Sequence, residues 1–315
     1  MPLPKVVITP RSYGLYSPLI WERWEAAGFH VTVEAGPLSE SKLSELLAEA
    51  DALLVGTDTV SKQVLVSAPN LKVISKYGVG VDNIETDYTQ NNGIQVYNTP
   101  GVNTEAVADY TWGLILSLAR RIPQSHTDLV QGKWKKRVGF EVYGKTIGIL
   151  GLGAIGKAVA KRATGFNMQV LAYDAFPDRS FAEAHGIQLA ELKFVLSGSD
   201  IITIHTALTP ETYHFIGEKE LSWMKREAML INTARGGILD ERALYDALIH
   251  HRISGAALDV FQTEPLASSP LCELDQVILT PHNASASVEA IKRMTERSTD
   301  HILQFFEREK EVCSS

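Results

Sequence analysis

The amino-acid sequence predicts an α/β protein built from two doubly wound parallel-sheet units. Short, continuous apolar runs alternate with helical patterns along the chain, which is typical of parallel strands covered by helices on both faces. A length of 315 residues suits two domains, and a hydrophobic fraction of 45% supplies enough apolar side chains for two cores. The formal net charge of −7 argues against a general nucleic-acid surface, which would need a basic face.

The first unit is predicted from the first third of the chain. Its strands are expected at four apolar runs, residues 6–9, 30–33, 52–55 and 73–75. Between the second and third strands, apolar residues recur at the spacing of an amphipathic helix: Leu43, Leu46, Leu47 and Ala50. A helical pattern at residues 288–306 is long enough to pack back on this unit.

The second unit follows a long apolar helix that is predicted at residues 104–120. Asn103 precedes this helix and is a residue type that commonly caps helices. Six further strands are predicted, at residues 146–150, 169–173, 200–204, 228–232, 255–258 and 277–279. Asp240 is expected to cap a helix at residues 241–250.

A glycine-rich turn, Gly151-Leu152-Gly153-Ala154-Ile155-Gly156, follows the first of these strands and opens a helix. The G-x-G-x-x-G spacing is weak evidence alone, but its place between a strand and a helix is typical of a dinucleotide site. Gly151 permits the tight turn, Gly153 lets the backbone approach a pyrophosphate, and Gly156 lets the helix pack closely on the strand. The free N–H groups and positive end of the helix would bind the pyrophosphate.

Asp174 ends the next predicted strand, eighteen residues after Gly156. A carboxylate at this place can bind the adenosine ribose hydroxyls, and it would repel the 2′-phosphate of NADP. The sequence therefore favours NAD as the cofactor. The alternative is a structural turn followed by an incidental aspartate.

Three later segments place chemically active side chains after predicted strands: Arg235, Glu264 and His282. Because ligands bind at the carboxyl ends of parallel strands, these side chains can converge despite their separation in sequence. An arginine can bind a carboxylate bidentately and polarise a carbonyl, and a histidine can transfer a proton near neutral pH. Glu264 would orient the ring of His282. Such a set suits the interconversion of a 2-hydroxy acid and a 2-keto acid without a metal.

Taken singly, each of these residues also fits a structural role. An arginine before two glycines is often a solvated loop residue, Glu-Pro is common in loops, and a histidine after Thr-Pro can be structural. Their joint occurrence downstream of the dinucleotide turn favours the catalytic interpretation.

Together these motifs resemble those of the D-isomer-specific 2-hydroxyacid dehydrogenases, most closely the phosphoglycerate dehydrogenase branch. The resemblance covers nearly the whole chain. It rests on segments in a specific order, residues 76–84, 98–104, 151–156 with Asp174, 232–237, 257–261 with 264–265, and 281–285.

The resemblance implies roles for individual residues. The catalytic triad would be Arg235, Glu264 and His282. The substrate loop would include Lys76, Val79 and Gly80, with backbone N–H groups around Val79 facing the substrate carboxylate. NAD would contact Thr104, Gly151, Gly153, Ala154, Ile155, Gly156, Asp174, Thr206, Thr233, Ala234 and, at the nicotinamide carboxamide, Asp259.

The resemblance also implies an architecture and partners. A Rossmann NAD domain, residues 99–290, would be inserted in a flavodoxin-like substrate domain, residues 1–98 and 291–315. The helix that starts at Thr104 would help to build a homodimer. The expected ligands are NAD and a small 2-hydroxy or 2-keto acid, with no nucleic acid, membrane or metal partner.

The resemblance implies 3-phosphoglycerate dehydrogenase-like activity, with hydroxypyruvate or glyoxylate reduction as the alternative. Residues 55–58 stand where some phosphoglycerate enzymes have an arginine suited to phosphate binding, which weighs against phosphoglycerate. A basic cluster at residues 133–137 could compensate if Lys135 or Arg137 reached the substrate tail in a partner subunit, and Lys76 could add to this phosphate site. The alternative is a solvated loop with a packed Trp134. A third alternative, from another class, is a non-catalytic NAD-sensing module like the transcriptional corepressors of this fold.

The sequence is expected to belong to a cytoplasmic protein. Cys272 and Cys313 are its only cysteines, which gives no disulfide framework and no zinc quartet. The apolar run at the N-terminus is too short for a secretory signal, and no window approaches the ~20 apolar residues of a membrane helix.

Overall fold

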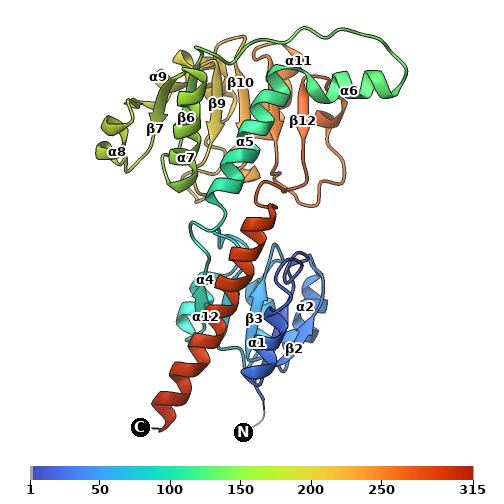
Figure 1. The fold of residues 1–315 in the computed structure, drawn as a ribbon, viewed down its shortest axis with the longest axis vertical. Helices are drawn as coiled ribbons and strands as arrows, with labels where there is room; N and C mark the ends of the chain where they lie inside the picture. The colour runs from blue at the N-terminus through green and yellow to red at the C-terminus, as the bar shows by residue number, and fades with distance from the viewer. Residues whose placement is uncertain (1–2, 315) are drawn as a thin grey trace. The chain divides into compact units, whose positions relative to one another are not determined.

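The computed structural model describes residues 3–314 and contains two compact units (Figure 1). Unit 1 combines the chain up to Asn103 with the segment from Ala286 onward, and unit 2 is the continuous segment Thr104–Ser285. Each unit has its own parallel sheet with helices on both faces.

Unit 1 contains a five-stranded sheet in the order β2-β1-β3-β4-β5, and every strand pair is parallel. The strands are β1 (Lys5–Ile8), β2 (His30–Val33), β3 (Ala52–Val55), β4 (Val73–Lys76) and β5 (Gln95–Tyr97). The helices are α1 (Ile20–Ala26), α2 (Glu40–Leu47), α3 (Lys62–Val66), α4 (Thr86–Asn91) and α12 (Val288–Ser314). This strand order is that of flavodoxin-like sheets, which confirms the predicted fold of this unit.

Apolar residues of unit 1 pack on both faces of its sheet. On one face, Leu43 and Leu47 of α2 are fully buried, as the amphipathic spacing predicts. On the other face, α12 packs on β4, β3 and α1, so the last helix returns to the first unit as predicted. Tyr13, Trp24 and Thr299 form a buried hydrogen-bonded chain in which the Tyr13 hydroxyl contacts the other two side chains at 2.7 and 2.5 Å.

Unit 2 contains a seven-stranded parallel sheet in the order β12-β11-β10-β9-β6-β7-β8. The strands are β6 (Thr146–Leu150), β7 (Gln169–Tyr173), β8 (Gln188–Leu189), β9 (Ile201–Ile204), β10 (Met229–Asn232), β11 (Gly255–Leu258) and β12 (Val277–Leu279). The helices are α5 (Thr104–Ala119), α6 (Ile122–Val130), α7 (Ala154–Ala163), α8 (Arg179–Ala184), α9 (Leu192–Gly198), α10 (Glu218–Trp223) and α11 (Glu241–Ile249). The six strands from β8 to β11 have the Rossmann order, with β12 added at the edge beside β11, so the predicted doubly wound fold is confirmed.

Two cores cover the two faces of the unit 2 sheet. The first contains side chains of α5 and α7, including Trp112, Ile115 and Val159. The second contains side chains of α9, α10 and α11, including Leu196 and Leu244. The reversal of strand order falls between β6 and β9, and open α/β sheets bind ligands at such a point.

The predicted helix caps differ in outcome. Asp240 caps α11 as predicted, because its Oδ1 accepts hydrogen bonds from the amides of Arg242 and Ala243 at 3.0 and 3.1 Å. The prediction for Asn103 is wrong: its Oδ1 accepts no hydrogen bond in the described chain, although α5 begins at the next residue. A capping residue type therefore does not ensure a cap, because the side chain must also point at the first turn.

Among the described residues, no helix is long and apolar enough to cross a membrane. Cys272 is an exposed free thiol. Cys313, the other predicted free thiol, lies outside the residues whose side chains the structure describes.

Candidate active site

The glycine-rich turn joins β6 to α7 with the geometry that a dinucleotide site requires. Gly151 has a φ of +95°, and a Cβ there would lie 2.7 Å from the backbone of His205 and Thr206, which follow β9. A Cβ at Gly156 would lie 2.0 Å from the carbonyl oxygen of Gly151. A Cβ at Gly153, by contrast, would meet nothing within 4 Å. Gly151 and Gly156 therefore allow tight packing, while Gly153 leaves open space beside the backbone.

The first turn of α7 is suited to an anion. Gly153 is the residue before the helix, and no side chain caps the helix start. Helix N-termini with free amides attract phosphate groups. The space beside Gly153 and the uncapped amides together fit a pyrophosphate.

Asp174 lies directly after β7, next to this turn. Its Oδ2 accepts a hydrogen bond from the Leu152 amide at 2.6 Å, and its Oδ1 accepts one from the Phe176 amide at 2.7 Å. Each carboxylate oxygen retains acceptor capacity beyond one hydrogen bond. The geometry fits the predicted contact with ribose hydroxyls, and it also shows that Asp174 organises the two backbone turns beside it.

Two buried polar atoms lie beside the same turn without a partner in the described chain, Oγ1 of Thr206 and Nδ1 of His205. Buried polar groups normally find a partner, so unpaired ones at a topological switch point fit a site for a polar ligand. Thr206 is one of the residues that the sequence assigns to NAD.

The other predicted NAD contacts lie in the same unit. Thr104 is the first residue of α5, and Ala154 and Ile155 begin α7. Thr233 and Ala234 follow β10, where the Thr233 hydroxyl lies 2.9 Å from that of Thr111 on α5. Sequence reasoning did not identify Thr111, because nothing in the sequence signals a pairing across 122 positions.

Glu264 and His282 are brought together from the loops that follow β11 and β12. Nδ1 of His282 lies 2.7 Å from Oε2 of Glu264. The other carboxylate oxygen of Glu264 accepts a hydrogen bond from the Phe261 amide at 3.0 Å. His282 has a left-handed backbone with a φ of +52°, which is uncommon outside glycine and occurs often at functional sites. The ring is therefore oriented by a carboxylate that is itself held in place.

Electrostatics link Arg235 to this pair. Burial alone would raise the pKa of Glu264, but the hydrogen bond and charge of His282, the Phe261 amide and the charge of Arg235 lower the pKa below its ordinary value. Arg235 follows β10, and Asn232 holds its loop by donating to the Arg235 carbonyl at 2.9 Å. The three predicted catalytic side chains thus share one local electrostatic environment.

Asp259 holds the histidine loop. It is fully buried, and it accepts hydrogen bonds from the Thr280 hydroxyl at 2.6 Å and from the amides of Asn283 and Ala284 at 2.9 and 2.8 Å. Its backbone carbonyl also accepts the His282 amide at 2.8 Å. The pKa of Asp259 is raised above its ordinary value, because the effect of burial exceeds the opposing effect of these hydrogen bonds. Its predicted contact with the nicotinamide carboxamide stays a prediction.

Comparison with known proteins agrees with this geometry. A family model for the NAD-binding domain of D-isomer specific 2-hydroxyacid dehydrogenases matches residues 112–284, more than half of the chain. A glyoxylate reductase of Korarchaeum cryptofilum is 42% identical over 280 residues, which cover 86% of this chain and 84% of that protein. The chain belongs to the D-isomer-specific 2-hydroxyacid dehydrogenases.

Other relatives act on different substrates. A D-3-phosphoglycerate dehydrogenase of Methanocaldococcus jannaschii is 44% identical over 259 residues, which cover 81% of this chain but 49% of that protein. A solved structure of D-lactate dehydrogenase from Aquifex aeolicus, complexed with NAD and lactic acid, has a TM-score of 0.85 at 28% identity and covers 98% of this chain and 96% of that one. The protein is accordingly an NAD-dependent oxidoreductase for small hydroxy or keto acids, as the sequence predicts.

The predicted substrate loop of this dehydrogenase lies in unit 1, after β4. Lys76 is only 6% exposed, and its Nζ donates to the Gly56 carbonyl and, at 2.9 Å, to Oδ1 of Asn83. Asn98 donates to the Val79 carbonyl at 2.7 Å. Within residues 3–314, the amides of Val79 and Gly80 donate to no backbone carbonyl, which suits the predicted anion contact.

Two residues of the basic cluster, Arg137 and Trp134, differ from the solvated-loop alternative, while the contact with a partner subunit's substrate stays a prediction. Arg137 does not extend into solvent, because it donates to Asp128 at 2.6 Å and to Asp275 at 2.5 Å. These ion pairs hold the loop against α6 and the segment before β12. Trp134, predicted in the solvated-loop alternative to be packed, is instead 88% exposed.

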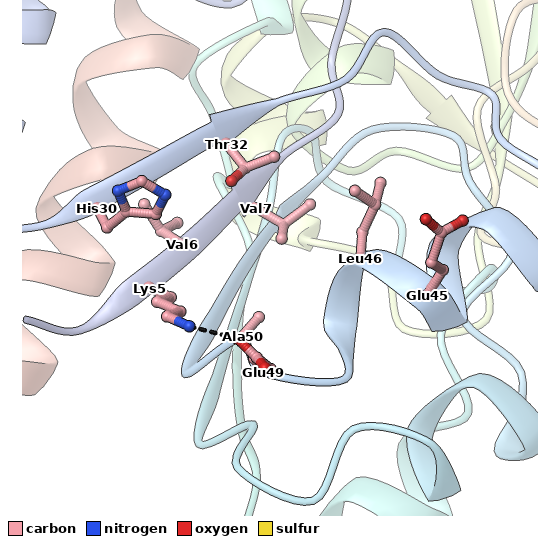
Figure 2. A pocket seen from close by; sticks show the side chains of 9 residues that line it. All are labelled: Lys5, Val6, Val7, His30, Thr32, Glu45, Leu46, Glu49 and Ala50. Atoms are coloured by element: carbon pink, nitrogen blue, oxygen red, sulfur yellow. Dashed lines mark hydrogen bonds and ion pairs between the residues drawn. The ribbon is translucent and has the colours of Figure 1, made fainter. Parts of the chain in front are cut away.

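Figure 2 shows the residues that line a hollow in unit 1. Its lining residues are Lys5, Val6, Val7, His30, Thr32, Glu45, Leu46, Glu49 and Ala50. Lys5 and His30 are the first residues of β1 and β2, so the hollow lies at the amino ends of these strands. Ligands of doubly wound sheets bind at the opposite, carboxyl ends, so this hollow is not part of the candidate site.

Proposed function

We propose that the dehydrogenase transfers the substrate proton through His282, with Glu264 and Arg235 as the other members of a catalytic triad. The hydrogen bond between His282 and Glu264 is the observation that carries this proposal. This hydrogen bond fixes the His282 ring beside the Glu264 carboxylate. Both side chains lie in loops at the carboxyl edge of the sheet.

The geometry of the His282 ring shows which of its nitrogen atoms would exchange a proton with the substrate. Because Nδ1 donates to Glu264, Nε2 is the atom left to exchange a proton with the substrate. When bound, the cofactor would supply redox chemistry: the reduced nicotinamide would give a hydride to the carbon that carries the reacting oxygen, and the oxidised form would accept one from it. In reduction, Nε2 of His282 gives its proton to that oxygen, and in oxidation it takes the proton back. Glu264 stabilises the charged ring in either direction.

Arg235 supplies a fixed positive charge. Its guanidinium can bind the substrate carboxylate in two parallel hydrogen bonds and polarise the neighbouring carbonyl. The glycine turn, with Asp174 and Thr206, is proposed to hold the pyrophosphate and ribose of NAD, since these groups offer an uncapped helix start, a carboxylate and an unpaired hydroxyl.

The substrate is proposed to be a small, unphosphorylated 2-keto acid such as glyoxylate or hydroxypyruvate. Two cations suggested by the sequence for a phosphate, Arg137 and Lys76, are engaged with protein oxygens. A substrate phosphate would have to compete with those contacts. A phosphorylated keto acid remains the second candidate, because the phosphoglycerate dehydrogenase relative is 44% identical.

We also propose that the protein is a homodimer. Apolar side chains gather along α6 and the loop that follows it, where Leu129, Val130, Trp134 and Val138 are 59–91% exposed. An exposed apolar surface of this kind is typical of a protein–protein interface. A second copy of the chain would bury it.

A substrate panel tests the proposed function. Purified protein is incubated with NADH and glyoxylate, hydroxypyruvate or 3-phosphohydroxypyruvate, and loss of NADH absorbance is followed. Higher kcat/KM for the first two substrates is expected, and a preference for the phosphorylated one would reverse the substrate assignment. Absence of turnover with a wider panel, despite NAD binding, would favour the non-catalytic NAD-sensing alternative.

A further inference from the structure

His214 lies between the loops that carry two proposed catalytic residues. It belongs to the segment between β9 and α10, and its amide donates to the Gly237 carbonyl at 2.8 Å. Gly237 follows Arg235 by two positions. The backbone of His214 is thus tied to the loop of Arg235.

The ring of His214 reaches the other loop. Its Nε2 forms a hydrogen bond with the side-chain amide of Gln262, two positions before Glu264. The backbone N–H of Gln262 donates to Oε1 of Glu241, at the start of α11, at 2.6 Å. Gln262 is therefore held from both its side chain and its backbone.

The two loops also touch directly. A Cβ at Gly236 would lie 1.9 Å from the carbonyl carbon of Phe261, so the backbones are in close contact there. The Phe261 amide donates a hydrogen bond to Oε1 of Glu264 at 3.0 Å. A displacement of residues 261–262 would therefore reach the Glu264 carboxylate through that hydrogen bond.

His214 has a left-handed backbone conformation at this position. Its φ is +51°, a value that is uncommon outside glycine and is found more often for Asn, Asp and His than for other residues. Its ring stacks on Tyr213 with 4.1 Å between ring centroids, and its Nδ1 lies 3.9 Å from Oδ2 of Asp240. Residues with uncommon backbone conformations persist where the surrounding contacts hold them in place, and they concentrate at functional sites.

We propose that His214 is a positioning residue, which fixes the Glu264 loop against the Arg235 loop through its contacts with Gln262 and Gly237. This inference rests on the proposed roles of Glu264 and His282. It assigns no contact with substrate or NAD to His214. Its effect is to hold Glu264 at hydrogen-bonding distance from His282.

The test uses two variants that break the same contact from opposite sides. His214→Asn keeps a residue that tolerates the left-handed backbone but is too short to reach Gln262. Gln262→Ala removes the partner. His251→Asn is the matched control, because His251 is an exposed histidine of unit 2 with a φ of +53°.

Both variants are expected to lower kcat by about 10- to 100-fold, the scale on which mispositioned catalytic groups act. The Kd for NADH, measured by fluorescence titration, should stay within about twofold of the wild-type value. The double variant should be no worse than either single variant, because both break one contact. The control should behave like the wild type.

A pH profile separates positioning from simple loss of stability. A loosened bond to His282 lets the pKa of Glu264 rise toward its ordinary value, so Glu264 is protonated at higher pH. The acidic limb of the kcat profile should therefore move to higher pH in both variants, whereas a purely structural role would leave it in place. If His214→Asn does not fold, judged by circular dichroism, Gln262→Ala carries the test alone.

The outcomes distinguish this inference from the proposed function. If Glu264→Gln and His282→Gln are impaired but His214→Asn and Gln262→Ala match the wild type, the positioning role is wrong and the triad stands. If Glu264→Gln and His282→Gln are themselves fully active, the proposed triad fails and the inference fails with it.

Discussion

Nδ1 of His282 lies 2.7 Å from Oε2 of Glu264, although eighteen positions separate the two residues. The first prediction concerns this histidine. His282→Gln should lower kcat by ~10²–10⁴, the usual contribution of a general acid–base. The Kd for NADH should change little, because the glycine turn is untouched. A variant with wild-type kcat on glyoxylate and hydroxypyruvate would remove His282 from the mechanism.

The second prediction concerns the pH dependence of stability. The pKa of Glu264 is lowered in the folded protein by His282, the Phe261 amide and Arg235, against the effect of burial. A lowered carboxyl pKa contributes stability above the unfolded-state pKa of ~4.3, and that contribution is lost as the pH falls through the folded-state pKa. The free energy of unfolding of the wild type, relative to Glu264→Gln, should therefore decrease as the pH falls below about 4.3. Urea titrations between pH 3 and pH 7 measure it, and a pH-independent difference would contradict the assignment.

The third prediction concerns the buried carboxylate that holds the histidine loop. Asp259→Asn exchanges one acceptor oxygen for an amide group, which leaves at least one of the donors from Thr280, Asn283 and Ala284 without a good acceptor. An unsatisfied buried donor costs about 1–3 kcal/mol of the free energy of unfolding. Activity should also fall, because the loop carries His282. Asp246→Asn, on the exposed side of α11, is the control and should be neutral in both assays.

The fourth prediction concerns the choice of cofactor. Asp174 should make NADP a poor cofactor, because its carboxylate would face the 2′-phosphate. Asp174→Asn keeps an acceptor for the Leu152 amide but removes the charge, and should raise the ratio of kcat/KM for NADP over NAD at least about tenfold, or ~1.4 kcal/mol. Asp178→Asn, four positions further on, controls for a general change in local charge. Equal use of NAD and NADP by the wild type would refute the role of Asp174.

The fifth prediction concerns assembly. Trp134→Ser combined with Val138→Ser replaces two side chains that are 88% and 91% exposed. If these side chains are buried by a second copy, the variant should be monomeric in light scattering coupled to size exclusion, while the wild type is dimeric. Phe194→Ser, on the exposed side of α9, should leave the oligomeric state unchanged. A monomeric wild type would end the dimer proposal.

Much of the fold could be predicted because its strongest signals are local. Residues 52–55 form a continuous apolar run that is buried along its whole length in β3. The glycine turn combines steric demands that only glycine meets at Gly151 and Gly156. By contrast, β5 and β8 have only three and two residues and are partly exposed, so neither gives a sufficient apolar run.

The candidate site was predictable only in part, for a related reason. Chemically distinctive residues such as His282 stand out after a predicted strand. The residues that hold them do not, because Asp259 and His214 act through contacts between distant loops. Arg137 shows the converse: its place in a basic cluster suggests a ligand-binding cation, while Asp128 and Asp275 neutralise it within the protein. A sequence shows which side chains are available, but pairing depends on the fold.

The split of unit 1 has a consequence during synthesis on the ribosome. Unit 2 is one continuous segment, so it can fold as soon as it has emerged. The face of β3 and β4 that α12 covers stays bare until the chain reaches Val288, 191 residues after the end of β5. At about 5–20 residues per second, that interval lasts roughly 10–40 s. The order of folding is therefore expected to oppose the order of the sequence, with the first five strands completing their domain last and offering a site for chaperones until then.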